Sequence, residues 1–396
     1  MAAEADTTQV QSAAIVPQEI DPNKELIRRA VEKAKEIADA GQTFEYILTV
    51  WQKRHSGDGP LGKALLFSLG SQSCSNSKGI HQIATGESGY GKSDGINQMC
   101  KLVYPLYSFN GGVTPQTLFY SELPDGIVIG LEDVQWNSEL GISVKRISSC
   151  FQEGAPKMST KELEGIEVRT AKRIAFWAST VDNQCDEQLR DRFLMYQVRS
   201  GHERANEIIN HMQEQDEGSE QVPADYELET KVCQALTYDL KLRLYHVVIP
   251  FAKRMKFEGD PRAYALFSDM IKASAIFRYT KRDEDEAGRL MATTEDFEDA
   301  KALYIELGGH DRDKFQGTEL DILKAILVKG TATQADIQEE TRLSPGRVSD
   351  VLNGRGKEGH GLIHKCKHLI VEEGRPKRYR LTVGFNPFGK VDIELA

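Results

Sequence analysis

The sequence predicts an α/β protein in which a parallel sheet lies between layers of helices and a smaller C-terminal module follows. Three observations predict this class. A Gly-rich loop at 86–93 joins a short strand pattern to a helical pattern, and two apolar runs, at 126–133 and 173–180, are typical of buried parallel strands. Residues 318–383 show three helix patterns followed by two strand patterns, which indicates the separate C-terminal module. A chain of 396 residues is long enough for two or three domains.

Composition limits the class of protein. An apolar fraction of 40% and a charged fraction of 28% are typical of a globular protein. No apolar run approaches the roughly 18 residues of a membrane span, and the N-terminus lacks the pattern of a signal peptide, so we expect a cytoplasmic protein with no membrane contact. The 6 cysteines are scattered without a C-x-x-C pair, which favours reduced thiols over a zinc site.

Charge is distributed unevenly along the chain. The net charge of −10 argues against a uniformly basic nucleic-acid binder. From Glu203 to Glu229 there are nine acidic residues and one arginine, whereas from Thr341 to Phe385 there are ten lysines and arginines and four acids. The C-terminal part is therefore the predicted surface for a nucleic acid.

Helical patterns precede the Gly-rich loop. Residues 1–20 show no periodicity and predict a disordered tail. Apolar spacing then predicts helices from Asp21 to about Gly41, over 43–54 and over 62–69, and a short, rather polar strand at 79–84.

The loop is Gly86-Glu87-Ser88-Gly89-Tyr90-Gly91-Lys92-Ser93, a complete G-x-x-x-x-G-K-[ST] motif, and Asp94 continues it into a helix. Its glycines let backbone N–H groups turn toward phosphate oxygens. Lys92 is suited to the β- and γ-phosphates, and the hydroxyl of Ser93 is a ligand for Mg²⁺. Residues 86–94 therefore predict a site for ATP and Mg²⁺. The alternative is a Gly-rich surface turn that matches the motif by chance.

Two carboxylates, Glu132 and Asp133, end the apolar run at 126–133. A carboxylate at the end of a strand beside a phosphate loop is suited to bind the magnesium ion or to orient the attacking water. We expect Glu132 to bind Mg²⁺ together with Ser93 and Asp133 to polarise the water, although the usual order is Asp then Glu. The alternative for Asp133 is a cap of the next helix.

A charged hairpin is predicted between the apolar runs at 126–133 and 173–180. Alternating residues over 156–170 indicate two short strands, on which Lys157 and Lys161 are suited to contact DNA phosphates. A solvated surface hairpin is the alternative. The following run ends in Ser179 and Thr180, whose hydroxyls are suited to position water near a γ-phosphate.

An arginine precedes Phe193 at the end of a polar segment. An arginine at the edge of a subunit can complete a neighbour's active site by neutralising charge in the transition state. Arg192 is the first candidate for this role and Arg190 the second. The alternative for either residue is a surface ion pair.

Helices are predicted for most of the remaining body, as a lid over 201–307, and a linker for 308–317. The expected lid elements are a charged helix and loop over 203–221, helices within 226–255 and over 262–278, a turn at 280–290 and a capped helix from Thr293 to Leu307.

Three helices and two strands are predicted for the module at 318–396, which is the plan of a winged helix-turn-helix. The helices are expected at 318–327, 333–341 and 344–352, and the strands at 362–371 and 376–383. A protein-docking winged helix is the alternative. The residues expected to contact DNA are Arg347, Arg355, Lys357, Arg375, Lys377 and Arg378.

The order of these motifs resembles that of an AAA+ ATPase. The phosphate loop, Leu131-Glu132-Asp133, Ser179-Thr180 and Asp191-Arg192-Phe193 follow one another and precede a helical lid. The hairpin before Arg173 and the segment from Arg262 to Ala275 resemble minichromosome-maintenance-like helicases. The similarity is strongest to the helicase halves of archaeal and bacterial mobile-element replication proteins and spans roughly residues 45–305.

This resemblance implies roles for single residues. Thr180 is the sensor-1 candidate, with Ser179 and Asn183 as alternatives, Arg192 is the arginine finger, and Arg262 is the sensor-2 residue that touches the γ-phosphate. It also implies a homo-oligomeric ring, a hexamer, that uses ATP to unwind or move along single-stranded or forked DNA in replication, with duplex DNA on the winged helix. The alternatives are a replication initiator or helicase loader that uses ATP as a switch, and a transcription regulator.

Overall fold

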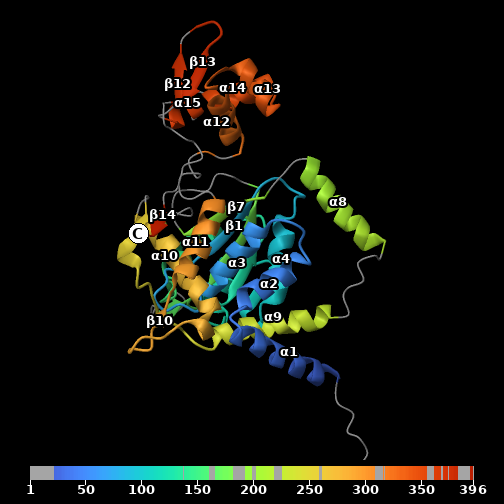
Figure 1. The fold of residues 1–396 in the computed structure, drawn as a ribbon, viewed down its shortest axis with the longest axis vertical. Coiled ribbons are helices and arrows are strands. Elements are labelled where there is room, and N and C mark those ends of the chain that lie inside the picture. Colours follow the sequence, from blue (N-terminus) through green and yellow to red (C-terminus); the bar gives the residue numbers. More distant parts are fainter. Residues whose placement is uncertain are drawn as a thin grey trace, which may run out of the picture.

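The computed structural model describes residues 22–136, 138–159, 166–181, 192–198, 202–217, 225–257, 261–307, 315, 317–354, 361–366, 369–372, 374–381 and 393–395. A five-stranded sheet with the order β2-β3-β6-β1-β7 forms the centre of the body (Figure 1). All its neighbouring strands are parallel, which confirms the predicted α/β class. The strands are β1 (His81–Thr85), β2 (Ser108–Asn110), β3 (Val128–Leu131), β6 (Ala175–Thr180) and β7 (Phe193–Gln197).

The register brings the carboxyl ends of four strands to one edge of the sheet. Thr85 at the end of β1 lies opposite Thr180 of β6 and Gln197 of β7, and Leu131 of β3 lies opposite Ala178 of β6. Strand β6 therefore separates the strand that leads into the phosphate loop from the strand that leads into the two carboxylates. The loop, the carboxylates and the polar end of β6 consequently share this edge.

Helices cover both faces of the sheet because successive residues of each strand point to opposite faces. In β6, Trp177 joins the larger core with α3 and α4, whereas Phe176 joins a second core with α5 and α6. The helices of the body are α1 (Pro22–Asp39), α2 (Thr43–Gln52), α3 (Gly59–Ser71), α4 (Lys92–Leu102), α5 (Pro115–Tyr120), α6 (Glu139–Ser149), α8 (His202–Asp216), α9 (Tyr226–Lys241), α10 (Pro261–Phe277) and α11 (Thr294–Glu306).

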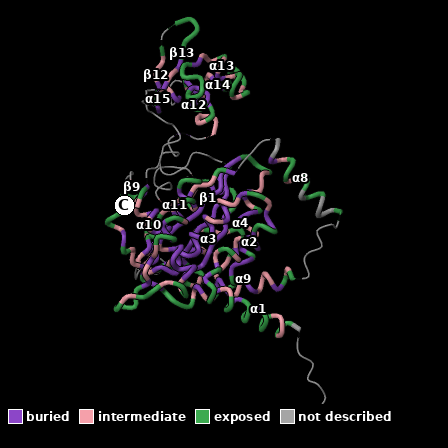
Figure 2. The backbone as a smooth tube through the Cα atoms, viewed as in Figure 1, coloured by how far each residue is buried: buried purple, intermediate pink, exposed green. Residues whose placement is uncertain are grey.

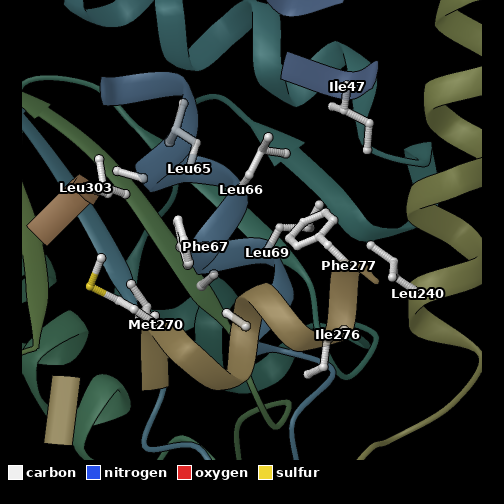
Figure 3. Close-up of a cluster of buried hydrophobic side chains, with 14 of the residues drawn as sticks. Ile47, Leu65, Leu66, Phe67, Leu69, Leu240, Met270, Ile276, Phe277 and Leu303 are labelled. Atoms are coloured by element: carbon white, nitrogen blue, oxygen red, sulfur yellow. The ribbon is translucent and has the colours of Figure 1, made fainter. Parts of the chain in front are cut away.

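The larger core lies where α2, α3, α9, α10 and α11 meet (Figure 3). Phe67, Leu69 and Phe277 are at most 1% exposed in this cluster. Gly70 lets α3 approach α10 closely, since a Cβ at this position would lie 2.9 Å from the carbonyl oxygen of Ala273. Figure 2 shows that burial is concentrated in these elements and that α1 and α8 are largely exposed.

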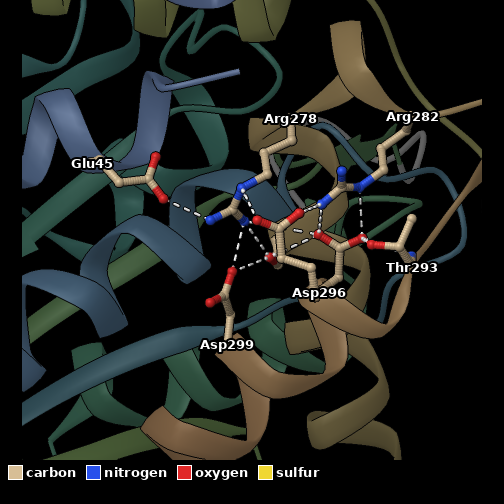
Figure 4. Close-up of polar contacts among 8 residues, drawn as sticks. Glu45, Arg278, Arg282, Thr293, Asp296 and Asp299 are labelled. Atoms are coloured by element: carbon tan, nitrogen blue, oxygen red, sulfur yellow. Dashed lines mark hydrogen bonds and ion pairs between the residues drawn. The ribbon is translucent and has the colours of Figure 1, made fainter. Parts of the chain in front are cut away.

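A network of buried charges joins α10, α11 and α2 (Figure 4). Asp296 is completely buried and accepts hydrogen bonds from Arg282, Ser274 and the backbone N–H of Thr293. Arg278 donates to Asp299, at 2.7 Å, and to Glu45 of α2, at 2.6 Å. This network fixes the start of α11, whose capping box at Thr293 was predicted.

Some predicted helical sequence forms strands instead. Within 226–255 the helix ends at Lys241, and β8 (Val247–Val248) pairs with β10 (Leu290–Met291). The β-branched run before Pro250 favours a strand over a helix. The proline then ends the strand. Strand β9 (Met255–Phe257) pairs with β14 (Ile393–Leu395).

The predicted hairpin is formed by β4 (Pro156–Ser159) and β5 (Ile166–Arg169). The Nζ atom of Lys157 lies 5.1 Å from the ring centre of Phe119 and 5.2 Å from that of Tyr120, both on α5. Lys161 lies outside the described residues.

A separate hydrophobic core supports the C-terminal module. A three-stranded sheet with the order β11-β13-β12 packs on its helices. Residues 362–365, predicted as part of a strand, form a helical turn instead. This turn packs against α14 and buries the side chain of Leu362 in the core of the module. The elements are α12 (Thr318–Lys329), β11 (Thr331–Thr333), α13 (Gln334–Thr341), α14 (Pro345–Asn353), α15 (Leu362–Lys365), β12 (Leu369–Glu372) and β13 (Arg378–Leu381).

The last strand belongs to the body. Ile393 of β14 is 1% exposed and lies in the larger core, opposite Phe257 of β9. The module predicted for 318–396 therefore ends before this strand. Within the described residues, no helix combines the length and the apolar character that crossing a membrane requires.

Candidate nucleotide-binding site

The phosphate loop joins β1 to α4 in a conformation that depends on glycine. Gly86, Gly89 and Gly91 have φ angles of 134°, 87° and 91°, which residues with a Cβ rarely adopt. Gly91 is the N-cap of α4 and has no side chain to cap the helix. The first N–H groups of α4 are therefore available to an anion, and the helix dipole favours one there.

Lys92 lies inside the loop. Its Nζ atom donates to the carbonyl oxygens of Gly86, at 2.8 Å, and Glu87, at 2.5 Å, and the residue is 6% exposed. Burial lowers the pKa of Lys92, while the nearby charges of Asp133 and Glu87 act in the opposite direction. The ammonium group is thus held at the place where the loop would enclose a phosphate group, and this donor set fits a triphosphate.

The hydroxyl end of β6 reaches the phosphate loop. The Oγ atoms of Ser93 and Ser179 lie 3.0 Å apart and form a hydrogen bond. Ser179 is completely buried and Thr180 is 2% exposed. Ser179, the alternative to Thr180, is therefore in direct contact with Ser93, the predicted magnesium ligand.

The two carboxylates after β3 face different surroundings. Asp133 lines a cavity of about 480 Å³ together with Lys92 and Ser93, and its left-handed backbone, with a φ of 46°, turns it toward the loop. Glu132 is absent from this lining and accepts a hydrogen bond of 3.2 Å from the Nδ2 atom of Asn97. For Mg²⁺, the residues that fit are therefore Ser93 and Asp133, whereas the prediction for Glu132 gains no support from its position.

A second set of residues, which the sequence did not predict, lines the same cavity. Arg54, His55 and Ser56 follow α2 and line the same cavity, as do Arg204, Ile208 and Met212 of α8. None of them belongs to a recognisable motif. In the sequence, the segment around Gly57 and Asp58 indicates only a turn. The one signal for this turn is Gly57, which adopts a positive φ in the structure.

His55 lies between two carboxylates. Its Nδ1 atom is 2.8 Å from Asp94 Oδ2, and its Nε2 atom is 3.2 Å from Asp58 Oδ2. Burial alone would lower the pKa of His55, but its hydrogen bonds to Asp58 and Asp94 outweigh this and raise the pKa above its usual value. Burial alone would raise the pKa of Asp58. Hydrogen bonds from His55 and Tyr196 and the charge of Arg204 outweigh this effect, so the pKa lies below its usual value. The geometry therefore favours an imidazolium between two carboxylates.

The two predicted arginines lie at the other end of the sheet. Arg192 directly precedes β7, and the backbone N–H of His81, at the start of β1, donates to its carbonyl oxygen. Arg192 and Arg262 line a second cavity of about 490 Å³, and neither lines the cavity of the phosphate loop. Strand β1 has 5 residues, or about 16 Å, between the two ends. The predicted contact of Arg262 with the γ-phosphate is therefore not made within one chain.

The residues of the C-terminal module that are predicted to contact DNA are exposed where the structure describes them, whereas Lys157 of the hairpin is half-buried. Arg347 is exposed in the first turn of α14, while Arg375, Lys377 and Arg378 are exposed at the turn between β12 and β13. Arg355 and Lys357, like Lys161, lie outside the described residues.

Comparison with known proteins identifies the domain that contains the phosphate loop. Residues 26–242, which run from α1 through α9 and are more than half of the chain, match the family model described as MTBMA_p00010 P-loop domain. No curated protein matches the sequence. The matched region includes the five-stranded parallel sheet and every residue of the loop. This chain belongs to the MTBMA_p00010 P-loop domain family.

Proposed function

We propose that this protein is an ATP-dependent DNA helicase or translocase of the AAA+ ring type that acts in DNA replication. The observation that carries the proposal is the separation of Lys92 from Arg192 and Arg262, which lie at cavities on opposite ends of the strands. An arginine at one end can reach only the phosphate loop of a neighbouring subunit. A head-to-tail arrangement that closes into a ring, as in a hexamer, would complete each site in this way.

The residues at the loop divide the chemistry of ATP hydrolysis among them. The N–H groups at the start of α4 and Lys92 would hold the β- and γ-phosphates, and Ser93 and Asp133 would hold Mg²⁺. When bound, Mg²⁺ neutralises charge that develops on the phosphate oxygens. Ser179 or Thr180 would orient the attacking water from the end of β6, which lies beside β1 as the AAA+ interpretation requires.

Two further parts support DNA as the substrate. The order of helices and strands in the C-terminal module supports a winged helix-turn-helix, in which α14 would be the recognition helix and the basic turn before β13 the wing. The hairpin β4–β5, which carries Lys157 on its first strand, is the second part. In the ring, Lys157 and Lys161 would contact the backbone of the strand in a central channel.

The deciding experiment is unwinding of forked DNA with ATP, run beside native mass measurement with and without nucleotide. We expect a nucleotide-dependent ring and DNA-stimulated hydrolysis, which Lys92→Ala abolishes. Rings that mix Lys92→Ala and Arg192→Ala subunits should regain part of the activity. Where the two variants meet, Lys92 of the Arg192→Ala subunit can face Arg192 of the Lys92→Ala subunit, so that both residues are intact at that interface. A monomer that never assembles and never unwinds DNA would contradict the proposal, and hydrolysis by Lys92→Ala would show that the site is wrongly assigned.

A replication initiator or helicase loader that uses ATP as a switch is the second candidate. It is favoured by Glu132, whose side chain binds Asn97 away from the cavity, and by Lys157, which packs on Phe119 and Tyr120. The double variant Lys157→Ala with Lys161→Ala separates the two functions. It should abolish unwinding by a translocase and leave the duplex binding of a switch protein unchanged.

A further inference from the structure

Helix α8 presents one face to the phosphate-loop cavity. Arg204, Ile208 and Met212 are four residues apart, so they share a face of the helix, and all three line the cavity with Lys92. Figure 1 shows α8 at the periphery of the body. Met212 remains 58% exposed. This helix therefore forms a wall of the cavity without being part of the core.

Arg204 fastens this wall to the body. It is 3% exposed, and its Nη2 atom donates to the carbonyl oxygen of Ser56, at 2.6 Å, and to Asp58 Oδ2, at 2.7 Å. Its Nη1 atom donates to Glu207, at 3.0 Å, while its buried Nε atom has no hydrogen-bond partner. A buried guanidinium with an unsatisfied donor is costly for stability, and this one lies at the wall of the phosphate-loop cavity.

Asp58 connects Arg204 to the phosphate loop. The same carboxylate binds Tyr196 OH, at 2.7 Å, and His55, whose other ring nitrogen binds Asp94 in the first turn of α4. The His55 ring also packs on the loop itself, since a Cβ at Gly91 would lie 3.0 Å from its Cε1 atom. A continuous chain of contacts thus runs from α8 through Arg204, Asp58 and His55 to the phosphate loop.

We propose that Arg204 is a positioning residue that couples the α8 wall to the phosphate loop, so that the cavity binds nucleotide tightly only when this chain of contacts is complete. The inference rests on the proposed nucleotide site. By reciprocity, bound nucleotide favours the docked position of α8 as much as docked α8 favours nucleotide. Loss of the contact should therefore weaken nucleotide binding and raise KM by a much larger factor than it lowers kcat.

The test compares Arg204→Ala and Arg204→Lys with Glu207→Ala in the full chain. Glu207 is the 46% exposed partner of Arg204 on the same helix, so its removal leaves Asp58 paired. The measurements are the Kd of a fluorescent ATP analogue, KM and kcat, and amide hydrogen exchange of residues 202–217 with and without ATP. We expect ATP to protect α8 in the wild-type protein and in Glu207→Ala. Arg204→Ala should lose this protection and bind the analogue about tenfold or more weakly.

Arg204→Lys keeps a charge beside Asp58 but lacks the planar fork, so it should fold and still bind nucleotide more weakly than wild type. It decides the matter if Arg204→Ala does not fold. An unchanged Kd and unchanged ATP-dependent protection in Arg204→Lys and in any folded Arg204→Ala would overturn the inference. If Lys92→Ala also binds the analogue normally, the nucleotide site itself is wrongly assigned, which is a different outcome.

Discussion

Substitution of Gly91 or Gly89 by alanine tests the geometry of the phosphate loop. Both glycines have nearly the same left-handed φ, 91° and 87°. A residue with a Cβ pays roughly 1–2 kcal/mol for this conformation. A Cβ at Gly89 would meet no atom within 4 Å, whereas a Cβ at Gly91 would lie 3.0 Å from the His55 ring. Overpacking of this kind typically costs about 1–3 kcal/mol more.

The two variants should therefore differ in their affinity for ATP. Gly89→Ala should weaken binding about 5- to 30-fold, which corresponds to the backbone cost alone. Gly91→Ala should lose about 2–5 kcal/mol, at least about 30-fold, because the bound loop cannot relax away from His55. Titration with a fluorescent ATP analogue measures both values, and Gly91→Ala in a His55→Ala background should recover the difference. Equal losses in the two single variants would refute the contact between His55 and the loop.

Two further predictions concern stability. The raised pKa of His55 means that its ion pairs stabilise the fold fully below the unfolded pKa of about 6.5, and that this contribution is lost as the pH rises through the folded pKa. In urea titrations, the advantage of wild type over His55→Gln should thus be larger at about pH 6 than at about pH 9, and a constant difference would contradict the charge on His55. Asp296→Ala leaves Arg282 and Arg278 without their buried partner and should cost about 3–5 kcal/mol of unfolding free energy. Glu45→Ala removes a 52% exposed carboxylate from the same network and should cost less than about 1 kcal/mol; similar losses in both would show that burial does not govern these pairs.

Local patterns were sufficient to predict the phosphate loop and the parallel strands. The loop depends on glycines and one lysine at fixed spacing, and a buried parallel strand such as 175–180 needs a continuous apolar run. The start of α11 was predictable for the same reason, because Thr293 and Asp296 satisfy each other across three residues.

Long-range contacts account for what the sequence did not reveal. Asp58 and Arg204 are 146 residues apart, and nothing near either residue indicates the other. The choice between Glu132 and Asp133 depends on a left-handed backbone at Asp133, which is set by the way the chain leaves β3. Strand β9 was not predicted, because its partner, β14, comes from the end of the chain.

The pairing of β14 with β9 gives the C-terminal module two attachment points on the body. The chain leaves the body after α11, enters the core of the module at Phe315 and returns to the body at Ile393. Because the module is tied to the body on both sides, it cannot turn freely about a single linker. If α14 binds DNA as proposed, the DNA would therefore stay close to the body through successive rounds of hydrolysis.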